Sequence, residues 1–312
     1  MTKTAFVFPG QGSQSVGMLA DLAADFDVVG QTFAEASERL GYDLWDLTQS
    51  GPEDKLNQTE FTQPALVAAS IAVWRVASSR GARTPDIVAG HSLGEYAALV
   101  VAGALDFGDA VALVRSRGQF MQTAVPVGEG GMAAILGLED EQVKAICAEA
   151  SGDAVVQAAN FNAPGQVVIA GATSALEAAI EACKAAGAKR AMPLPVSAPF
   201  HSELMRPAAE NMATALADVE IRRPEVPVIQ NVHARVEADP EKIRENLVAQ
   251  MYSAVLWTDT VRSMAADGVT GAVECGPGKV LSGLIKRIDK SIDTVAIGDA
   301  AGMESAASEL WS

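Results

Sequence analysis

The segment from Pro85 to Gly103 constrains the fold more than any other stretch of the chain. A short apolar run at residues 87–89 leads into Gly90-His91-Ser92-Leu93-Gly94, and small apolar residues follow at 95–103. Gly-x-Ser-x-Gly between a strand and a helix predicts a nucleophile elbow, a turn so sharp that only glycine avoids collisions on either side of the serine. The pattern therefore predicts a serine hydroxyl exposed at the carboxyl end of a strand, beside a helix N-terminus that favours negative charge.

Short apolar runs alternate with longer stretches of helical periodicity along most of the chain. This alternation is typical of an α/β protein with a doubly wound parallel sheet, and the elbow makes the expected sheet hydrolase-like. We expect strands at residues 4–8, 87–89, 226–231 and 270–274, and helices at 32–40, 63–79, 95–103, 109–121, 203–217, 241–252 and 280–288.

The pattern changes after the glycine-rich segment at residues 125–131. From there the chain predicts strand, helix, strand, strand, helix and strand, which is the ferredoxin-like order. The expected strands are 132–136, 154–160, 166–170 and 188–194, and the expected helices are 139–149 and 173–186. We therefore expect a small ferredoxin-like subdomain at 127–196, inserted into a large catalytic domain formed by 1–126 and 197–312.

Charge and cysteine content disfavour several classes of function. The formal net charge is −16, which disfavours non-specific binding to nucleic acid or to an anionic membrane. The first residues lead straight into an apolar strand without a signal-peptide core, and no run is long enough for a transmembrane helix. Cys147, Cys183 and Cys275 are scattered without disulfide or metal spacing. We expect a cytoplasmic globular protein that binds no metal.

A loop rich in glycine and glutamine, Pro9 to Gly17, follows the first predicted strand. It partly matches a dinucleotide-binding fingerprint, but the third required glycine is replaced by Ser15 and no acidic residue ends a second strand at the expected distance. The sequence therefore disfavours a dinucleotide site. The loop still places flexible backbone at the carboxyl edge of the sheet, where α/β proteins form binding sites.

A serine nucleophile needs a base within hydrogen-bond reach, and the chain has three histidines. His91 adjoins Ser92, but neighbouring side chains on a tight turn diverge. His233 follows a predicted strand and could cap its end. His201 lies in a proline-rich loop where the small subdomain rejoins the large one, the kind of cleft in which sites form. His201 is the best candidate for the base, although a structural role remains open for each histidine.

Arg117 stands on a largely apolar predicted helix. A helical arginine is usually solvated or part of a surface ion pair. The apolar surroundings make burial plausible here, and a buried guanidinium requires a carboxylate or phosphate partner. The sequence leaves open whether that partner is an acidic side chain or a ligand.

Taken together, six motifs resemble those of the malonyl-CoA:acyl-carrier-protein transacylases of bacterial fatty-acid synthesis. The resemblance covers essentially the whole chain, in order, and is far more specific than the elbow alone. The matching segments are residues 8–14, 90–95, 115–118, 160–166, 197–202 and 274–281.

The resemblance implies a role for each matched position. Ser92 corresponds to the nucleophile that carries the acyl group, and His201 to the general base and then general acid. The main-chain N–H groups of Gln11 and Leu93 correspond to the oxyanion hole. The main-chain carbonyl of Gln250 takes the place of the acid that orients the histidine in a hydrolase triad.

The same resemblance implies how the substrate is selected. Arg117 corresponds to the arginine that pairs with the free carboxylate of malonyl. Phe200 matches malonyl-selective relatives, in which its bulk narrows the pocket. The implied activity is ping-pong transfer of malonyl from malonyl-CoA to the phosphopantetheine thiol of acyl carrier protein, with no cofactor. We also expect the enzyme to be a monomer.

An acidic carrier protein needs local basic residues on an enzyme that is itself acidic. The candidates are Lys189 with Arg190, and Lys286 with Arg287 and the nearby Lys290, although a solvated charged face is an equally good interpretation of either cluster. Two other functions stay open from the sequence. One is a serine esterase or thioesterase, in which water accepts the acyl group. The other is a scaffold that binds acyl-CoA or a carrier protein and has no turnover.

Overall fold

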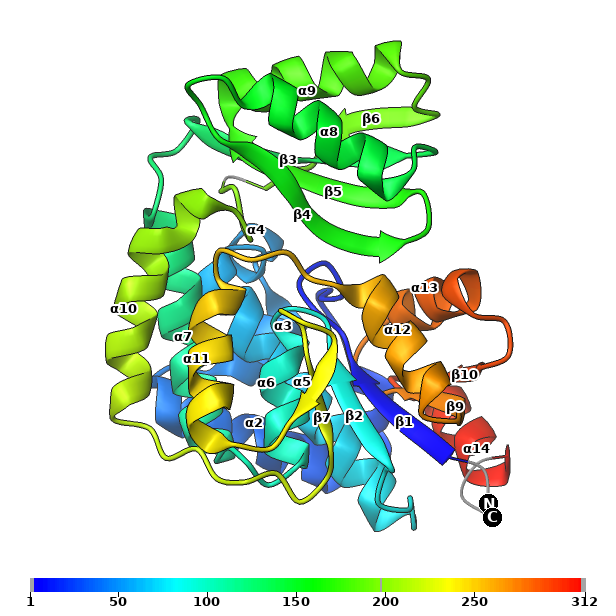
Figure 1. The fold of residues 1–312 in the computed structure, drawn as a ribbon. Coiled ribbons are helices and arrows are strands. Elements are labelled where there is room, and N and C mark those ends of the chain that lie inside the picture. The colour runs from blue at the N-terminus through cyan, green and yellow to red at the C-terminus, as the bar shows by residue number, and fades with distance from the viewer. Residues whose placement is uncertain (1–2, 197, 310–312) are drawn as a thin grey trace.

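The computed structural model describes residues 3–196 and 198–309, so Ser197 of the 197–202 motif lies outside the described residues. Its larger sheet runs diagonally through the lower part of the molecule (Figure 1). The strand order across this sheet is β10 (Asp293–Ala296), β9 (Val269–Glu274), β1 (Lys3–Phe8), β2 (Ile87–Gly90), β7 (Val228–Gln230) and β8 (Arg235–Glu237). It is an α/β fold with a mixed, mainly parallel sheet.

The expectation of a wholly parallel sheet is wrong at one edge. Neighbouring strands are parallel from β10 to β7, but β8 pairs antiparallel with β7. Only residues 231–234 connect β7 to β8. So short a connection permits an antiparallel hairpin, whereas a parallel neighbour requires a crossover of a dozen residues or more.

Successive side chains of β1 enter different cores, as the twofold periodicity of a strand requires. Phe6 and Phe8 join one cluster, and Ala5 and Val7 join the other. Two helices, α12 (Trp257–Ala266) and α13 (Val280–Ile288), cover the second face. The helices that contribute side chains to the cluster on the first face are α1 (Ala20–Asp25), α2 (Asp27–Leu40), α3 (Leu44–Ser50), α4 (Glu53–Leu56), α5 (Thr59–Ser79), α6 (Gly94–Val101), α7 (Phe107–Thr123), α10 (Arg206–Ala217), α11 (Pro240–Gln250) and α14 (Ala300–Glu309).

Most helix boundaries lie close to the predicted ones, and the differences have local causes. Helix α7 begins at Phe107 because the Asp106 carboxylate accepts from the N–H groups of residues 108 and 109. Helix α5 begins one turn earlier than expected, so Pro64 lies inside it. The predicted helix 203–217 starts as a 3₁₀ turn, η1 (Glu203–Met205), and becomes α-helical where proline occupies its first turn.

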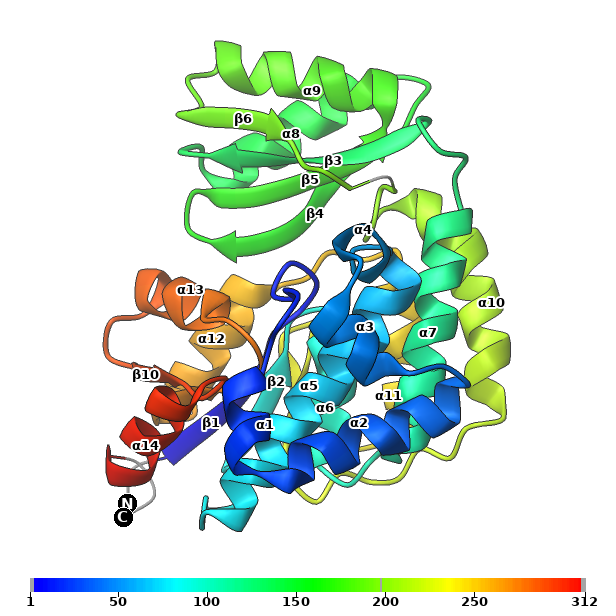
Figure 2. The ribbon, with the colours of Figure 1, turned by 180° about the vertical axis from the view of Figure 1, so that it is seen from behind.

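The second sheet has the predicted β-α-β-β-α-β order. Its strands β3 (Gly130–Leu136), β4 (Val156–Ala163), β5 (Gln166–Ala172) and β6 (Arg190–Pro193) form an antiparallel sheet in the order β4-β5-β3-β6. Helices α8 (Asp140–Ser151) and α9 (Thr173–Ala185) pack on its outer face, away from the larger sheet (Figures 1 and 2).

Strand β4 bonds the small sheet to the segment just before α12, at Val255. It runs three residues beyond the predicted end at residue 160, because Phe161 and Ala163 stay paired with Val167 and Gln166 of β5. Val255 adds main-chain bonds beside this pairing: Phe161 N–H donates to the Val255 carbonyl, and Val255 N–H donates to the Ala159 carbonyl. Val255 is about ninety residues away in sequence, so no local pattern predicts this contact. The inner face of the small sheet is thereby held over the carboxyl edge of the large one.

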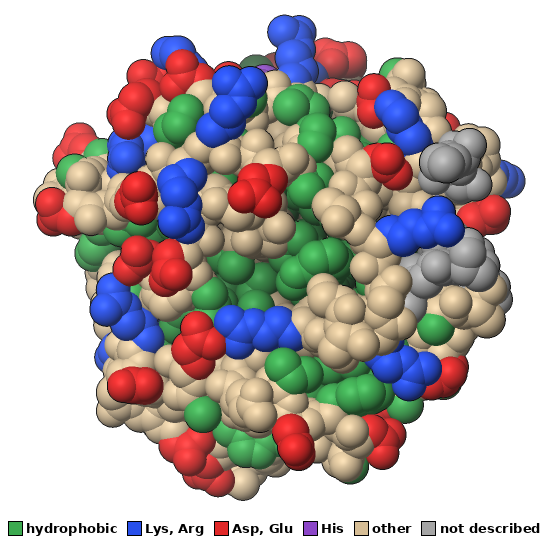
Figure 3. Space-filling model, turned by 90° about the horizontal axis from the view of Figure 1, so that it is seen from below, with side chains coloured by type: hydrophobic (Ala, Val, Ile, Leu, Met, Phe, Trp, Pro, Cys, Tyr) green, Lys and Arg blue, Asp and Glu red, His purple; other side chains and the backbone are tan. Residues whose placement is uncertain are grey.

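The surface carries mixed charge. On the face opposite the small sheet, acidic and basic side chains are interspersed around a central group of hydrophobic side chains (Figure 3). The excess of acidic residues is therefore not gathered into one patch on this face. Within the described ranges, no helix combines the length and apolarity needed to cross a membrane.

Candidate functional site

The predicted elbow is present between β2 and α6. Ser92 has φ 51°, a left-handed conformation that is uncommon for a residue with a side chain. A Cβ at Gly90 would lie 1.9 Å from the carbonyl carbon of Gly94, and one at Gly94 would lie 2.0 Å from the Phe8 carbonyl oxygen. Glycine is thus required on both sides of the serine because backbone, which cannot move aside, fills the space.

Asn231, at the end of β7, holds this strained turn from the side. Its Oδ1 accepts from the Ser92 N–H at 2.7 Å, and its Nδ2 donates to the Gly90 carbonyl at 2.7 Å. The Asn231 side chain therefore spans the elbow from the residue before His91 to the residue after it. This role was not predicted from the sequence, although Asn231 stands at the end of a predicted strand, where site residues gather in α/β sheets.

His201 is the histidine that meets the serine. Its Nε2 lies 2.7 Å from Ser92 Oγ, and its Nδ1 lies 2.8 Å from the main-chain oxygen of Gln250. A carbonyl can only accept, so we assign the ring proton to Nδ1, and Nε2 is left to accept the serine proton. Burial, with a smaller contribution from the Arg117 charge, lowers the pKa of His201 to about 3. The imidazole is therefore neutral at physiological pH.

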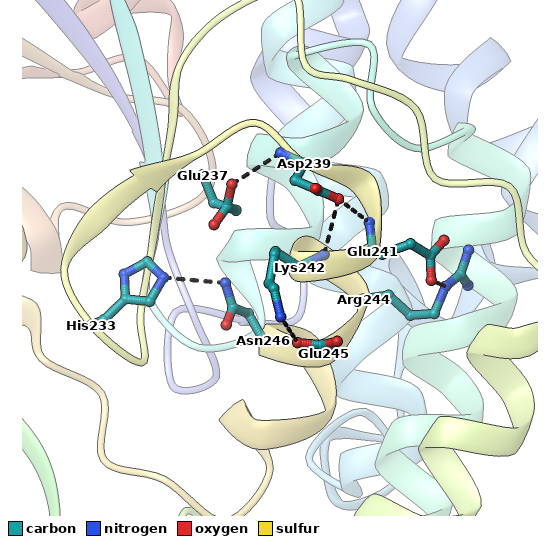
Figure 4. Close-up of polar contacts among 8 residues, drawn as sticks. All are labelled: His233, Glu237, Asp239, Glu241, Lys242, Arg244, Glu245 and Asn246. Atoms are coloured by element: carbon teal, nitrogen blue, oxygen red, sulfur yellow. Dashed lines mark hydrogen bonds and ion pairs between the residues drawn. The ribbon is translucent and has the colours of Figure 1, made fainter.

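The other two histidines point elsewhere. The Nε2 of His91 lies 2.8 Å from Asn162 Oδ1 on β4, and its ring lies beside Trp257. Diverging side chains on the elbow were expected. His233 lies against Asn246 of α11, beside the charged side chains of that helix (Figure 4). The histidine that bonds to Ser92 is His201.

Arg117 is fully buried on α7, with 1% of its surface exposed. Its Nη1 donates to Gln63 Oε1 at 2.9 Å, and its Nη2 donates to Gln250 Oε1 at 2.9 Å and to Ser92 Oγ at 3.1 Å. Within residues 3–196 and 198–309, no carboxylate forms an ion pair with it. The surface ion pair considered for this residue is therefore wrong, and its three acceptors are all neutral.

A cavity of about 240 Å³ joins these groups. Its volume suits a small acyl group, and Phe200, which is only 8% exposed, forms part of the wall. Gln11 and Leu93 also line it, and in the part of the chain that is described neither main-chain N–H has a hydrogen-bond acceptor. The lining residues are Gln11, Gln63, His91, Ser92, Leu93, Arg117, Met121, Met132, Asn160, Asn162, Val168, Leu194, Val196, Phe200 and His201.

Two further hollows share lining residues with this cavity, Gln11 among them. One, of about 160 Å³, shares Gln11, His91 and Asn162 with it and is bordered by α13 and the start of β5. The other, of about 810 Å³, shares Gln11, Leu194 and Val196 and is bordered mainly by amide and hydroxyl side chains of α5 and α7. Gln11 thus lines the Ser92 cavity and both adjoining hollows.

The two predicted basic clusters lie near one of these hollows. Arg190 pairs across the sheet with Leu136, which in turn pairs with Gln166. The Arg287 guanidinium donates to Gln166 Oε1 at 2.8 Å. The clusters, about a hundred residues apart in sequence, thus approach the same end of the small sheet, and Gln166 also lines the smaller hollow. The basic side chains Lys189, Arg190, Lys286, Arg287 and Lys290 are all exposed.

Metal ligands are not grouped in the described residues, since no set of three or more His, Cys, Asp or Glu side chains is arranged to hold an ion. Cys147, Cys183 and Cys275 are buried free thiols. The chemistry available in the cavity is that of a serine, a neutral imidazole, a buried guanidinium and free main-chain N–H groups.

Comparison with known proteins identifies the family. The model of the acyl transferase domain matches residues 5–307. The chain therefore belongs to the acyl transferase family, and it is an acyltransferase.

Its relatives are more specific. The chain is 56% identical to the malonyl CoA-acyl carrier protein transacylase of Escherichia coli K12 over 98% of this chain and 99% of that protein. It is 48% identical to that of Bacillus subtilis, covering 99% and 98%. The acyl carrier protein S-malonyltransferase of Vibrio cholerae has the same fold, with a TM-score of 0.96, 57% identity and coverage of 98% and 100%. These matches confirm the resemblance inferred from the motifs.

One solved relative was captured with its partner. It is a malonyl-transacylase in complex with a type II PKS acyl-carrier protein, with a TM-score of 0.97, 53% identity and coverage of 98% of this chain and 99% of that one.

Proposed function

We propose that this protein transfers malonyl from malonyl-CoA to the phosphopantetheine thiol of acyl carrier protein, for fatty-acid chain elongation. The observation that carries the proposal is the position of Ser92 Oγ, which lies between His201 Nε2 at 2.7 Å and Arg117 Nη2 at 3.1 Å in one small cavity. A nucleophile, a base and a cation for the carboxylate are thus available together. The names of the relatives, which are malonyl transacylases, support the same substrates.

The reaction follows from these groups as two equivalent displacements. Ser92 Oγ bonds to the thioester carbon of malonyl-CoA while His201 Nε2 takes the hydroxyl proton. The carbon–sulfur bond then breaks, and His201 returns the proton to the CoA thiolate. The carrier thiol attacks malonyl-Ser92 in the same way, and the proton goes back to Ser92 Oγ. No bond in this sequence needs a cofactor.

The oxyanion of each tetrahedral intermediate is assigned to the N–H groups of Gln11 and Leu93. Both residues line the cavity, and neither N–H has another acceptor among the described residues. Losing one such donor typically costs about 10²–10³ in rate. The Gln250 carbonyl holds the His201 ring, so a carboxylate is not needed to orient it.

Substrate choice is assigned to Arg117 and Phe200. The malonyl carboxylate would supply the charged partner that the buried guanidinium lacks, whereas an acetyl group would leave the guanidinium uncompensated. The Phe200 ring, which lines the same cavity, would exclude a branched α-carbon by its bulk.

The exposed basic residues 189, 190, 286 and 287, with 290, are proposed to receive the acidic carrier protein. Their common position beside the smaller hollow supports this, because that hollow shares three lining residues with the Ser92 cavity. The phosphopantetheine arm would reach Ser92 through the smaller hollow. A relative solved with its carrier protein supports docking of this kind of partner.

The architecture supports a two-part description of the chain. We describe 1–126 and 197–312 as a hydrolase-like catalytic domain, because the elbow follows a central parallel strand. Residues 127–196 form a ferredoxin-like subdomain, because the strand order β4-β5-β3-β6 belongs to a β-α-β-β-α-β unit. Every proposed catalytic group comes from one chain, which suits a monomer. The buried free thiols suit a cytoplasmic location.

The test is intact mass of the protein after mixing with malonyl-CoA and, separately, with acetyl-CoA. We expect a malonyl adduct that survives gel filtration, is absent in Ser92→Ala, and is discharged by a carrier-protein thiol. Discharge to water alone would indicate a thioesterase. Failure to form an adduct with either acyl-CoA would reject the acyltransferase proposal and leave a carrier-binding scaffold.

A further inference from the structure

Glu95 is a buried acidic residue that the proposed reaction leaves without a role. It stands directly after the elbow in α6 and is only 1% exposed. A carboxylate in such a position costs folding free energy unless its oxygens are well bonded. Its Oε2 has two donors, and in the described residues its Oε1 has none. A group held at this cost beside the nucleophile calls for a functional explanation.

The first donor to Glu95 is the main-chain N–H of Asn231, at 2.9 Å. The side chain of Asn231 holds the elbow through the Ser92 N–H and the Gly90 carbonyl, each at 2.7 Å. Glu95 thus fixes the residue that fixes the nucleophile.

The second donor is Gln250 Nε2, at 3.0 Å. The same nitrogen donates to the Ser92 carbonyl at 3.1 Å, while Gln250 Oε1 accepts from Arg117 and the Gln250 carbonyl accepts from His201. One glutamine therefore touches the nucleophile residue, the base and the substrate-binding cation. Glu95 determines which way its amide group faces, because a carboxylate accepts only from the NH₂ side.

The Gln250 amide lies between the Glu95 carboxylate and the Arg117 guanidinium, so the negative charge is near Arg117 without touching it. The carboxylate polarises the Gln250 amide, and the amide oxygen faces the guanidinium. Direct pairing of Glu95 with Arg117 would occupy the cation and compete with a substrate carboxylate. Relayed through the amide, the charge stabilises the buried guanidinium and leaves it available.

We propose that Glu95 is a positioning residue of the acyltransferase site, which through Gln250 and Asn231 keeps His201, Arg117 and Ser92 in register for malonyl transfer. The inference rests on the proposed function. Because the negative charge orients the amide and supports Arg117, the ionised form of Glu95 is the active one.

The surroundings of Glu95 make its ionisation measurable. Burial raises its pKa to about 7, while the Asn231 and Gln250 hydrogen bonds and the Arg117 charge act in the opposite direction. The titratable groups that face it are Arg117 from α7 and Tyr96 from α6. Arg117 stays protonated at neutral pH, and the pKa of Tyr96 is raised to about 12, chiefly by burial. His201, with a pKa of about 3, does not titrate in this range.

The test measures the rate of malonyl-Ser92 formation by rapid-quench mass spectrometry from about pH 5 to about pH 9. The wild-type rate should fall as the pH falls through about 7, as Glu95 takes up a proton. Glu95→Gln should load malonyl about 10- to 100-fold more slowly than wild type at the alkaline end, with no pH step near 7, because small misplacements of reacting groups carry costs of this size. Its preference for malonyl over acetyl should also fall.

Glu274→Gln is the matched control, since Glu274 is also a fully buried glutamate but accepts from the first turn of α13, at residues 281 and 282. It should keep both the rate and the pH step. Equal losses in the two variants, or a Glu95→Gln enzyme with wild-type rate and pH step, would overturn the inference. If Glu95→Gln does not fold, the wild-type profile decides, and a flat profile overturns it. Absence of any wild-type adduct would instead reject the proposed function.

Discussion

The ring of His201 is held by a main-chain atom, with its Nδ1 donating to the carbonyl oxygen of Gln250 at 2.8 Å. The side chain of Gln250 serves other partners, Arg117, Glu95 and the Ser92 carbonyl. One residue therefore holds the His201 ring through its backbone and the Arg117 guanidinium through its side chain. The two roles can be separated by mutation, because a side-chain substitution leaves the carbonyl in place.

Gln250→Ala should separate the role of the Gln250 side chain from the role of its main-chain carbonyl. The contact to His201 remains, but Arg117 loses an acceptor, which is worth about 1.5 kcal/mol and hence about a tenfold decrease in malonyl loading. Acetyl has no carboxylate to pair with Arg117, so acetyl loading should change less. Single-turnover loading of both acyl-CoAs measures this. Gln119→Ala, an exposed site on α7 whose side chain bonds Glu60, is the control. Equal losses for both substrates would contradict the division.

Arg117→Lys keeps the charge but loses the planar fork of donors that reaches Gln63, Gln250 and Ser92. We expect kcat/KM for malonyl-CoA to fall about 100-fold, with a smaller change for acetyl-CoA. Arg115→Lys on the same helix removes a partly buried bond to the Leu40 carbonyl and should keep the ratio of the two substrates. An unchanged ratio in Arg117→Lys would remove this residue from substrate selection.

Gly90→Ala should destabilise the fold because its Cβ would lie 1.9 Å from backbone at Gly94. The expected loss is about 3 kcal/mol in the free energy of unfolding, measured by urea denaturation. Gly30→Ala is the matched control. Gly30 lies in α2 with nothing within 4 Å of the added Cβ, so alanine there should stabilise by about 0.5–1 kcal/mol. A tolerated Gly90→Ala would mean that the elbow can relax.

His201 should make stability depend on pH. Folding lowers its pKa from the ordinary 6.5 to about 3, first through burial and then through the charge of Arg117. The unfolded chain binds this proton below about 6.5 and the folded chain does not, so the stabilisation is complete above about pH 6.5 and is lost as the pH falls toward 3.

Urea denaturation at pH 7 and pH 4 measures this effect. Between pH 7 and pH 4, the free energy of unfolding of the wild type should fall by about 3 kcal/mol more than that of His201→Gln. His233→Gln removes a partly exposed histidine that lies against α11 (Figure 4). It should have a smaller effect on the difference in the free energy of unfolding between the two pH values. Identical pH dependence in wild type and His201→Gln would contradict a neutral buried imidazole.

Reversing charge at residues 189 and 190, or at 286 and 287, should raise KM for the carrier protein and leave malonyl loading from CoA intact. Association between charged surfaces depends on such groups, and the effect should diminish at high salt. Lys242→Glu, an exposed change on α11, is the control. A carrier KM that stays unchanged in both double variants would reject this docking surface.

Local patterns predicted most of the individual elements. Twofold alternation in β1 and the small residues after Ser92 carry enough information within a few positions. The antiparallel edge strand β8 and the extension of β4 were not predicted, because both depend on pairing partners. In β4, the added residues Phe161 and Ala163 pair with Val167 and Gln166 of β5.

The motif was enough to predict the elbow, since a side chain at Gly90 would meet the backbone of Gly94 four residues later. The exclusion at Gly94 comes instead from the backbone of Phe8 in β1. The family motifs also identified His201 and Arg117 as the partners of Ser92. Only the tertiary structure decided how they meet. Ser92, Arg117 and His201 come from three elements, and Glu95 contacts Asn231 and Gln250 across more than 130 residues. Hydrogen bonds act over about 3 Å, so these contacts exist only where the fold brings the ends of β2, β7 and α11 together.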